Sequence, residues 1–370
     1  FLFSFRNGLS IQLPDFIFAG LLIAALLSFF INSQETNSTK EYLLLVASLA
    51  GYVACRPMVA EDATAVRSAF ERITAAIVLL GAIFTAAEMF SQWGGRPGRP
   101  LVFGFGAAGT YFMASLGFLV IALVTVDKPR PKRTAMVCAL IFIPTAIFAA
   151  AMVRFTFLAL AASLFVAMIL AERGKRWHVA AVAFSIFLAV VVGLAARYDT
   201  AKTYAAYILE ETVEIRAGGG GAGAPSPEMP SCHLAVNMSN SIAIRKALAS
   251  DAIHLIPTSG LVGTGLDSFM RFSCIKAHEV HVSALQAIVE FGWLGGIFWV
   301  LLMGLVIFRL APIAKHKGAI RFILCSLVFT ILLSFAYGRM SRDSALFAFL
   351  GAAVGMTTQN RKPSLPKSRH

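Results

Sequence analysis

The chain has 370 residues, of which 58% are hydrophobic and 14% are charged. A typical soluble domain carries about 25% charged residues, so this chain has too little polar surface to cover a soluble fold of its size. The formal net charge of +13 would suggest nucleic-acid binding in a soluble protein. Here the basic residues lie between apolar runs, so we expect a protein that contacts membrane lipids and binds no nucleic acid.

Apolar runs long enough to cross a bilayer recur along most of the chain. A helix needs roughly 17–25 such residues to span the hydrocarbon core. The runs predict an all-α polytopic membrane protein with ten spans, at 13–31, 41–59, 70–90, 104–126, 134–152, 155–171, 177–195, 285–308, 319–337 and 344–357. No cleavable signal peptide is visible, and because the chain begins at Phe1 rather than Met we expect further residues upstream.

The Lys and Arg residues near the span ends predict the orientation. Cytoplasmic segments are enriched in these residues. With both termini inside, the basic clusters fall on the cytoplasmic side, at 56–72, 128–133, 173–176, 309–321 and 361–369. The prediction divides the chain into N-terminal spans, one large periplasmic loop, C-terminal spans and a basic cytoplasmic tail, at 1–195, 196–284, 285–357 and 358–370 respectively.

The large loop is the one hydrophilic segment long enough to form a subdomain. Its start, 198–216, has helical spacing, and the Gly/Pro-rich stretch 216–230 is typical of a mobile linker. A second helix is expected from a cap at Asn237 or Ser239 to about Ile256. The following Gly-rich turn, 260–269, fits no nucleotide-binding fingerprint, so by itself it is interpreted as a loop.

The loop also contains Cys232 and Cys274. An oxidising periplasm would allow these two residues to form a disulfide. The alternative is a pair of free thiols. Neither a CxxC motif nor a His/Cys metal-ligand spacing is present, so we expect no metal site and no cofactor.

Two arginines on the outer side are candidates for function. Arg154 stands between two spans with almost no loop around it, so it must lie near the outer interface. It either serves a site or is an arginine whose head reaches the lipid headgroups. Arg245 lies in the second loop helix, where composition alone favours a solvated surface charge.

His278 and His281 precede the eighth span. Their i, i+3 spacing would place them on one face of a helix that starts early, with Glu279 pointing elsewhere. A histidine there can act as a general base, because its ordinary pKa is near neutrality. It can equally be structural. Glu290 lies inside the span and needs a partner, so it is expected to brace the histidine region or a neighbouring helix.

Three motifs in this order resemble those of the O-antigen ligase and polymerase superfamily. The stretch from His281 through Leu285, Gln286, Glu290 and Gly292 to Gly295 resembles the family pattern His-Asn-x-x-Leu-Gln-x-x-x-Glu-x-Gly-x-x-Gly. Upstream, Ser241-x-x-x-Arg245 and Gly263-x-Gly265-x-x-x-Phe269 resemble its Ser-x-x-x-Arg helix and Gly-x-Gly turn. Arg154 stands where the family has Ser-Arg-Gly. Val282 replaces the usual Asn, and Val153 and Phe155 replace the usual Ser and Gly. Members usually have about twelve spans.

The resemblance implies an enzyme of the bacterial inner membrane with its active site facing the periplasm. It would transfer a glycan from undecaprenyl diphosphate to a lipid A–core acceptor, without metal or nucleotide. Arg154 and Arg245 would then bind the diphosphate and His281 would be the general base, with His278, Glu290, Gly263 and Gly265 in support.

Three other functions are compatible with the sequence. A glycan polymerase or a protein O-oligosaccharyltransferase would use a similar donor and a different acceptor. A membrane transporter belongs to another class, but transporters often contain internal repeats and none is evident here.

Overall fold

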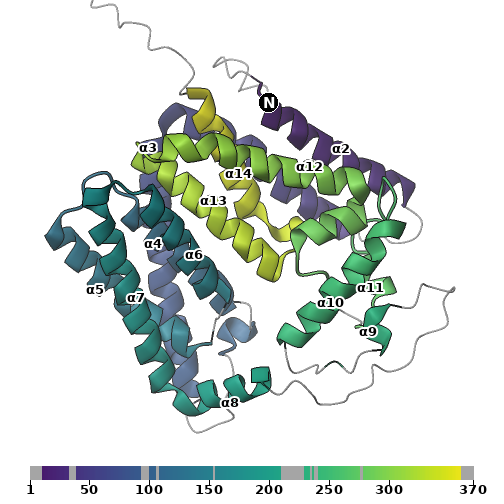
Figure 1. The fold of residues 1–370 in the computed structure, drawn as a ribbon. Helices are drawn as coiled ribbons and strands as arrows, with labels where there is room; N and C mark the ends of the chain where they lie inside the picture. The colour runs from purple at the N-terminus through teal and green to yellow at the C-terminus, as the bar shows by residue number, and fades with distance from the viewer. Residues whose placement is uncertain are drawn as a thin grey trace, which may run out of the picture.

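The computed structural model describes residues 11–32, 39–92, 100–105, 108–152, 155–209, 229–233, 236, 241–275 and 278–359. Within these ranges every regular element is a helix (Figure 1). The α-helices are α2 (Leu13–Ile31), α3 (Thr39–Ser91), α4 (Ala108–Val124), α5 (Pro131–Ala150), α6 (Phe155–Leu170), α7 (Arg176–Ala196), α8 (Tyr198–Leu209), α9 (Pro230–His233), α10 (Ser241–Leu255), α11 (Phe269–Phe272), α12 (Ser283–Ala314), α13 (Gly318–Tyr337) and α14 (Ser344–Gln359). Short 3-10 turns are η1 (Val102–Gly104), η2 (Arg173–Lys175), η3 (Ile256–Thr258) and η4 (Met340–Arg342).

Every predicted span is helical in the structure. Within the described ranges, seven helical segments are long and apolar enough to cross a membrane: Leu13–Ile31, Thr39–Val59, Ala63–Ser91, Pro131–Ala150, Arg173–Ala196, Ser283–Ala314 and Gly318–Ala336. Three shorter apolar helices, Ala108–Val124, Phe155–Leu170 and Ser344–Thr357, occupy the remaining predicted positions. The fold is therefore consistent with an all-α membrane protein, while ten crossings stay a prediction.

The described helices α9, α10 and α11 of the predicted large loop lie at one end of the bundle, which we call the loop side. Here α2 ends beside the Gly-rich turn, since the Asn32 side chain donates to the Gly263 carbonyl over 3.3 Å. Here too the connection from α13 to α14 meets the start of α3, where Arg339 pairs with Glu41. The small helices α9, α10 and α11 pack at this end (Figure 1). The other end is called the opposite side.

The second and third predicted spans correspond to two arms, Thr39–Val59 and Ala63–Ser91, of the element α3. The two arms nevertheless run in opposite directions. Arg56 in the first arm meets Asp15 at the opposite side, and in the second arm Gly81 packs against Phe112 near the start of α4.

Helix α13 forms the centre of the bundle. Of its 18-residue apolar window, 67% is buried, against 28–39% for the other candidate spans. It lies between the group α4–α7 and the group formed by α2, α3, α12 and α14 (Figure 1). Because its neighbours surround it, α13 fixes the position of the α13–α14 connection at the loop side.

Charged side chains at the opposite side serve the ends of helices. Arg321, 2% exposed, donates to the Ala314 and Lys315 carbonyls at the end of α12. Arg67 donates to the Ala122 and Thr125 carbonyls at the end of α4. The last carbonyls of a helix lack intrahelical partners, so these cations satisfy groups that would otherwise be unpaired.

Candidate functional site

Helix α12 is broken at Gly292, which has φ 75° and ψ −173°. An unbroken helix would join the Trp293 N–H to the Val289 carbonyl and the Leu294 N–H to the Glu290 carbonyl. In this chain the Gly-rich turn replaces both bonds. Thr264 and Gly265 donate to the Val289 and Glu290 carbonyls over 3.0 Å each, and Trp293 and Leu294 donate to the Gly260 and Leu261 carbonyls over 3.0 and 3.4 Å. The break thus leaves none of these four groups unsatisfied.

Two glycines allow this close backbone approach. A Cβ on Gly263 would lie 2.4 Å from the Glu290 backbone, and a Cβ on Gly292 would lie 2.3 Å from the Leu261 carbonyl. Both have positive φ, which favours glycine. The Gly-rich turn predicted as a loop is therefore a loop that docks into a transmembrane helix and holds the large loop against it.

Glu290 is buried beside this break. Gln286 Nε2 donates to its carboxylate over 2.7 Å, and Ser28 of α2 donates to its backbone carbonyl over 2.6 Å. Gln286 Oε1 also accepts the Met340 N–H over 3.0 Å. Glu290 therefore braces α2 and, through Gln286, the α13–α14 connection. The expected partner of the buried carboxylate is thus Gln286 of the same helix, and the contact with α2 is made by the backbone carbonyl of Glu290.

The expected helical pairing of His278 and His281 is wrong, because α12 begins at Ser283. Residues 278–282 form an irregular segment whose last residue, Val282, is extended (φ −126°, ψ 106°). Glu279 does point to a different partner from the histidines, as expected. Its carboxylate lies 2.6 Å from Arg339 Nε.

Arg339 is the centre of a buried charge cluster formed with Glu41, Asp267 and Glu279. Its nitrogens lie 3.3 Å from the Glu41 carboxylate and 2.5 Å from the Asp267 carboxylate, besides the contact with Glu279. The arginine side chain is 9% exposed. A buried charge needs several partners to offset its desolvation. The cluster joins α3, the Gly-rich turn, the histidine segment and η4 at one point of the loop side.

The electrostatic field at the histidine segment favours neutral His281. Burial, the positive charge of Arg245 and then His278 lower the His281 pKa to about 4. Burial raises the pKa of the Glu279 carboxyl, although Arg339 opposes this shift. His281 is consequently uncharged at neutral pH, and the charge of Arg245 contributes to this effect.

A cavity of about 560 Å³ opens at the loop side between α4, α10, α13 and the start of α14. Its lining includes Arg245, Arg342 and Asp343 at the polar end and Phe118 and Leu333 deeper in the bundle. The Arg245 guanidinium lies over the Phe155 ring, 4.2 Å from its centroid. Arg245 is thus partly buried at a cavity rather than a solvated surface charge.

Asp343 beside this cavity is also perturbed. Burial raises its pKa to about 6, although Ser334 donates to the carboxylate over 2.6 Å. The carboxyl therefore titrates close to neutrality, so near neutral pH it can hold or release a proton at the lining of this cavity.

The large loop has a core of its own. Cys232 and Cys274 form a disulfide with a Cα–Cα distance of 5.2 Å. Beside it, the buried Asp251 carboxylate accepts bonds from the Ser231 N–H, the Ser231 hydroxyl and the Ser273 hydroxyl. These contacts join α9, α10 and the segment after α11, and they keep α10, which carries Arg245, in place.

The structure thus brings together most of the residues named from the sequence. Gly263, Gly265 and Glu290 meet at the break in α12, and the charge of Arg245 acts on His281. Arg154, the linker 216–230 and the caps Asn237 and Ser239 fall wholly or almost wholly outside the described residues. Among the described residues no group of His, Cys, Asp and Glu side chains is suited to hold a metal ion.

Sequence reasoning missed the role of Arg339, Arg342 and Asp343. All three lie in the short hydrophilic segment between the last two predicted spans, to which the sequence analysis assigns no function. The density of charge in that segment was an available signal. Their partners lie as much as 300 positions away, so the pairing itself could not be read from the sequence.

Comparisons with family models, with curated proteins and with solved structures give no match for this chain.

Proposed function

We propose that this protein is a glycosyltransferase that moves a glycan from undecaprenyl diphosphate to a lipid A–core acceptor, in the manner of the O-antigen ligases. The observation that carries the proposal is the loop-side cavity, which Arg245 and Arg342 line with two cations, together with His281, whose pKa the charge of Arg245 helps to lower. In this proposal the loop side faces the periplasm, and the lipid-linked donor enters from the inner membrane.

The arginines bind the diphosphate of the donor. A guanidinium is planar, stays charged and can bind two phosphate oxygens at once. As the bond between the anomeric carbon and the phosphate oxygen breaks, the electron pair leaves with the diphosphate. Arg245, together with Arg154, stabilises that developing charge, an effect worth several kcal/mol in other enzymes.

His281 accepts the proton of the acceptor hydroxyl. The hydroxyl oxygen forms the new bond to the anomeric carbon from the side opposite the leaving group, so the proposal predicts inversion. A pKa of about 4 gives a weak base in the empty site. A bound diphosphate offsets the positive charge of Arg245, which lowers this pKa, so donor binding makes His281 more basic at the moment when a base is needed.

The acceptor decides between the ligase and its alternatives. A glycan polymerase or a protein O-oligosaccharyltransferase would share the donor site. A transporter would bind the same lipid without transfer. A cavity lined by two arginines, together with a neutral histidine on which Arg245 acts, favours an enzyme over a transporter.

The test expresses the protein in a Gram-negative strain that lacks its own ligase and displays the lipopolysaccharide on a gel. Wild type and His254→Ala, an exposed histidine of α10, should restore the glycan ladder. His281→Ala should lose about 10²–10⁴-fold in transfer, and Arg245→Lys about 100-fold.

Longer lipid-linked chains without a ladder would favour a polymerase. A full ladder from His281→Ala would refute the proposed base.

A further inference from the structure

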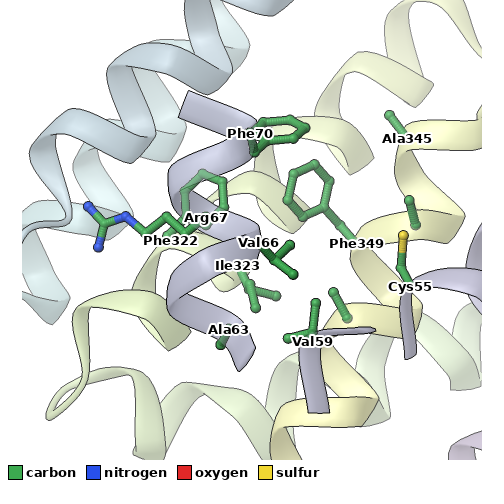
Figure 2. A pocket seen from close by; sticks show the side chains of 12 residues that line it. Cys55, Val59, Ala63, Val66, Arg67, Phe70, Phe322, Ile323, Ala345 and Phe349 are labelled. Atoms are coloured by element: carbon green, nitrogen blue, oxygen red, sulfur yellow. The ribbon is translucent and has the colours of Figure 1, made fainter. Parts of the chain in front are cut away.

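Two cavities lie along α14 and share one lining residue, Ala345. The first is the loop-side cavity of about 560 Å³, which we call the mouth cavity. The second, of about 120 Å³, lies between the two arms of α3, α13 and α14, and we call it the inner cavity (Figure 2). Ala345 is an exposed residue in the first turn of α14. Its side chain is a single methyl group, so little bulk stands where the two cavities share their lining.

The mouth cavity presents two arginines from separate elements. Arg245 comes from α10 and is held over Phe155. Arg342 comes from η4, is 55% exposed, and lies 3.7 Å from the Glu41 carboxylate. Two guanidinium groups on one cavity fit a ligand with more than one negative charge, and their geometry suits phosphate oxygens.

The inner cavity presents apolar atoms. The rings of Phe70, Phe322 and Phe349 stand around it, with centroids 5.6–5.9 Å apart. Arg67 belongs to the lining, but its guanidinium donates to the end of α4 and points away from the cavity (Figure 2). An apolar space of this kind stays dry and accepts an apolar chain.

The cavities line up along a single helix face. On α14, Ala345 is followed by Ala348, Phe349 and Ala352 as lining residues of the inner cavity. Residues 345 to 352 cover about 10 Å of helix. A ligand with its charged head at the arginines can therefore extend an apolar tail past Ala345 and along α14. The small volume of the inner cavity fits one chain better than the paired chains of a glycerolipid.

We propose that Ala345 is the passage through which the polyprenyl tail of a lipid diphosphate enters the inner cavity, and that Arg342 joins Arg245 in holding the diphosphate. This inference rests on the proposed function for the identity of the lipid. It makes Ala345 a specificity-determining residue, because a larger side chain there closes the passage while it leaves the mouth cavity open.

Binding to the purified full-length chain in nanodiscs tests the passage. The probes are farnesyl diphosphate, which has a head and a tail, and inorganic pyrophosphate, which is a head alone. Ala345→Phe should lower the affinity for farnesyl diphosphate by about tenfold, since it removes the burial of roughly two CH₂ groups or more. It should leave the affinity for pyrophosphate unchanged. Arg342→Gln should lower the affinity for both probes by about 10–100-fold, because it removes a hydrogen bond to a charged group.

The matched control is Ala76→Phe, the same change on an exposed face of α3 outside both linings. It should leave both probes unchanged. The passage is refuted if Ala345→Phe binds farnesyl diphosphate as well as wild type does. It is also refuted if the variant loses as much affinity for pyrophosphate as for farnesyl diphosphate.

A second measurement needs no substitution. Cys55 lines the inner cavity and Cys138 of α5 does not, and both are partly buried free thiols. Farnesyl diphosphate should slow the alkylation of Cys55 by N-ethylmaleimide, measured by mass spectrometry, and pyrophosphate should not. Cys138 should react at the same rate throughout. Unprotected Cys55 at saturating farnesyl diphosphate would rule out this tail path.

These readouts separate the inference from the function on which it rests. Binding and alkylation need no acceptor, whereas the lipopolysaccharide ladder does. A protected Cys55 without any ladder would retain the passage and reject the ligase. A ladder with an unprotected Cys55 would retain the ligase and reject the passage.

Discussion

The two ends of the bundle use their charged residues differently. At the opposite side, Arg56 lies 2.7 Å from Asp15, and Arg321 and Arg67 donate to the last carbonyls of α12 and α4. Each of these contacts joins or ends helices. At the loop side, Arg339 gathers three carboxylates, and Arg245, Arg342 and Asp343 line a cavity.

This difference separates stability from function. A charge that ends a helix has its partner in the fold itself, and the site is complete without a ligand. The arginines of the mouth cavity instead border a space large enough for a small molecule. Helix ends explain the arginine contacts of the opposite side, and the three carboxylates explain Arg339, whereas the arginines of the mouth cavity leave room for a ligand. The following predictions test that separation.

The largest effect is expected from Arg339→Gln. It leaves Glu41, Asp267 and Glu279 close together without their cation, and breaking a buried ion pair costs about 3–5 kcal/mol. Arg56→Gln at the opposite side removes one partner of a single carboxylate, so we expect about 1–3 kcal/mol. Thermal unfolding in detergent gives both values. An equal loss of unfolding free energy in the two variants would mean that the loop-side cluster stabilises the fold no more than the single ion pair of Arg56 does.

The disulfide should stabilise the loop alone. Cys232→Ser with Cys274→Ser removes a link that closes 42 positions of chain, which is worth about 2–4 kcal/mol. Limited proteolysis should then cut within 229–275 at a higher rate, while the fragments of the apolar helices stay protected. Cys138→Ser, a free thiol of α5, is the control. Faster cleavage throughout the bundle would show that the loop is not a separate unit.

The docking of the Gly-rich turn into α12 should not tolerate a methyl group. Gly263→Ala places a Cβ 2.4 Å from the Glu290 backbone at a positive φ, and strain of this kind costs about 1–3 kcal/mol. Gly304→Ala in the same helix meets nothing within 4 Å and should raise stability by about 0.5–1 kcal/mol. Thermal unfolding of the two variants measures both changes in stability. A neutral Gly263→Ala would mean that the turn and the helix do not approach this closely.

The sequence was a good guide to helices and a poor one to their long-range contacts. Apolar length placed α2 and α7 within a residue of their observed bounds, because membrane-spanning length is a local property. The break at Gly292 could not be predicted, since it depends on the docking of a turn about 30 positions away. The pairing of Arg339 with Glu41 depends in the same way on the packing of α3 against α14. Motif resemblance drew attention to Gly263, Glu290 and His281, but not to the contacts that join them.

The smallest expected effect is a shift in titration. A lowered pKa means that His281 stays neutral as the pH falls and becomes protonated near pH 4, whereas an unperturbed histidine does so near 6.5. Diethyl pyrocarbonate modifies neutral imidazole, so the rate at His281, followed by mass spectrometry, should stay constant from pH 7.5 to about 5. Replacing Arg245 by Gln removes one cause of the lowered pKa, so the midpoint should move upward. A midpoint near 6.5 in the wild type would contradict the buried, positively charged surroundings that distinguish this end of the molecule.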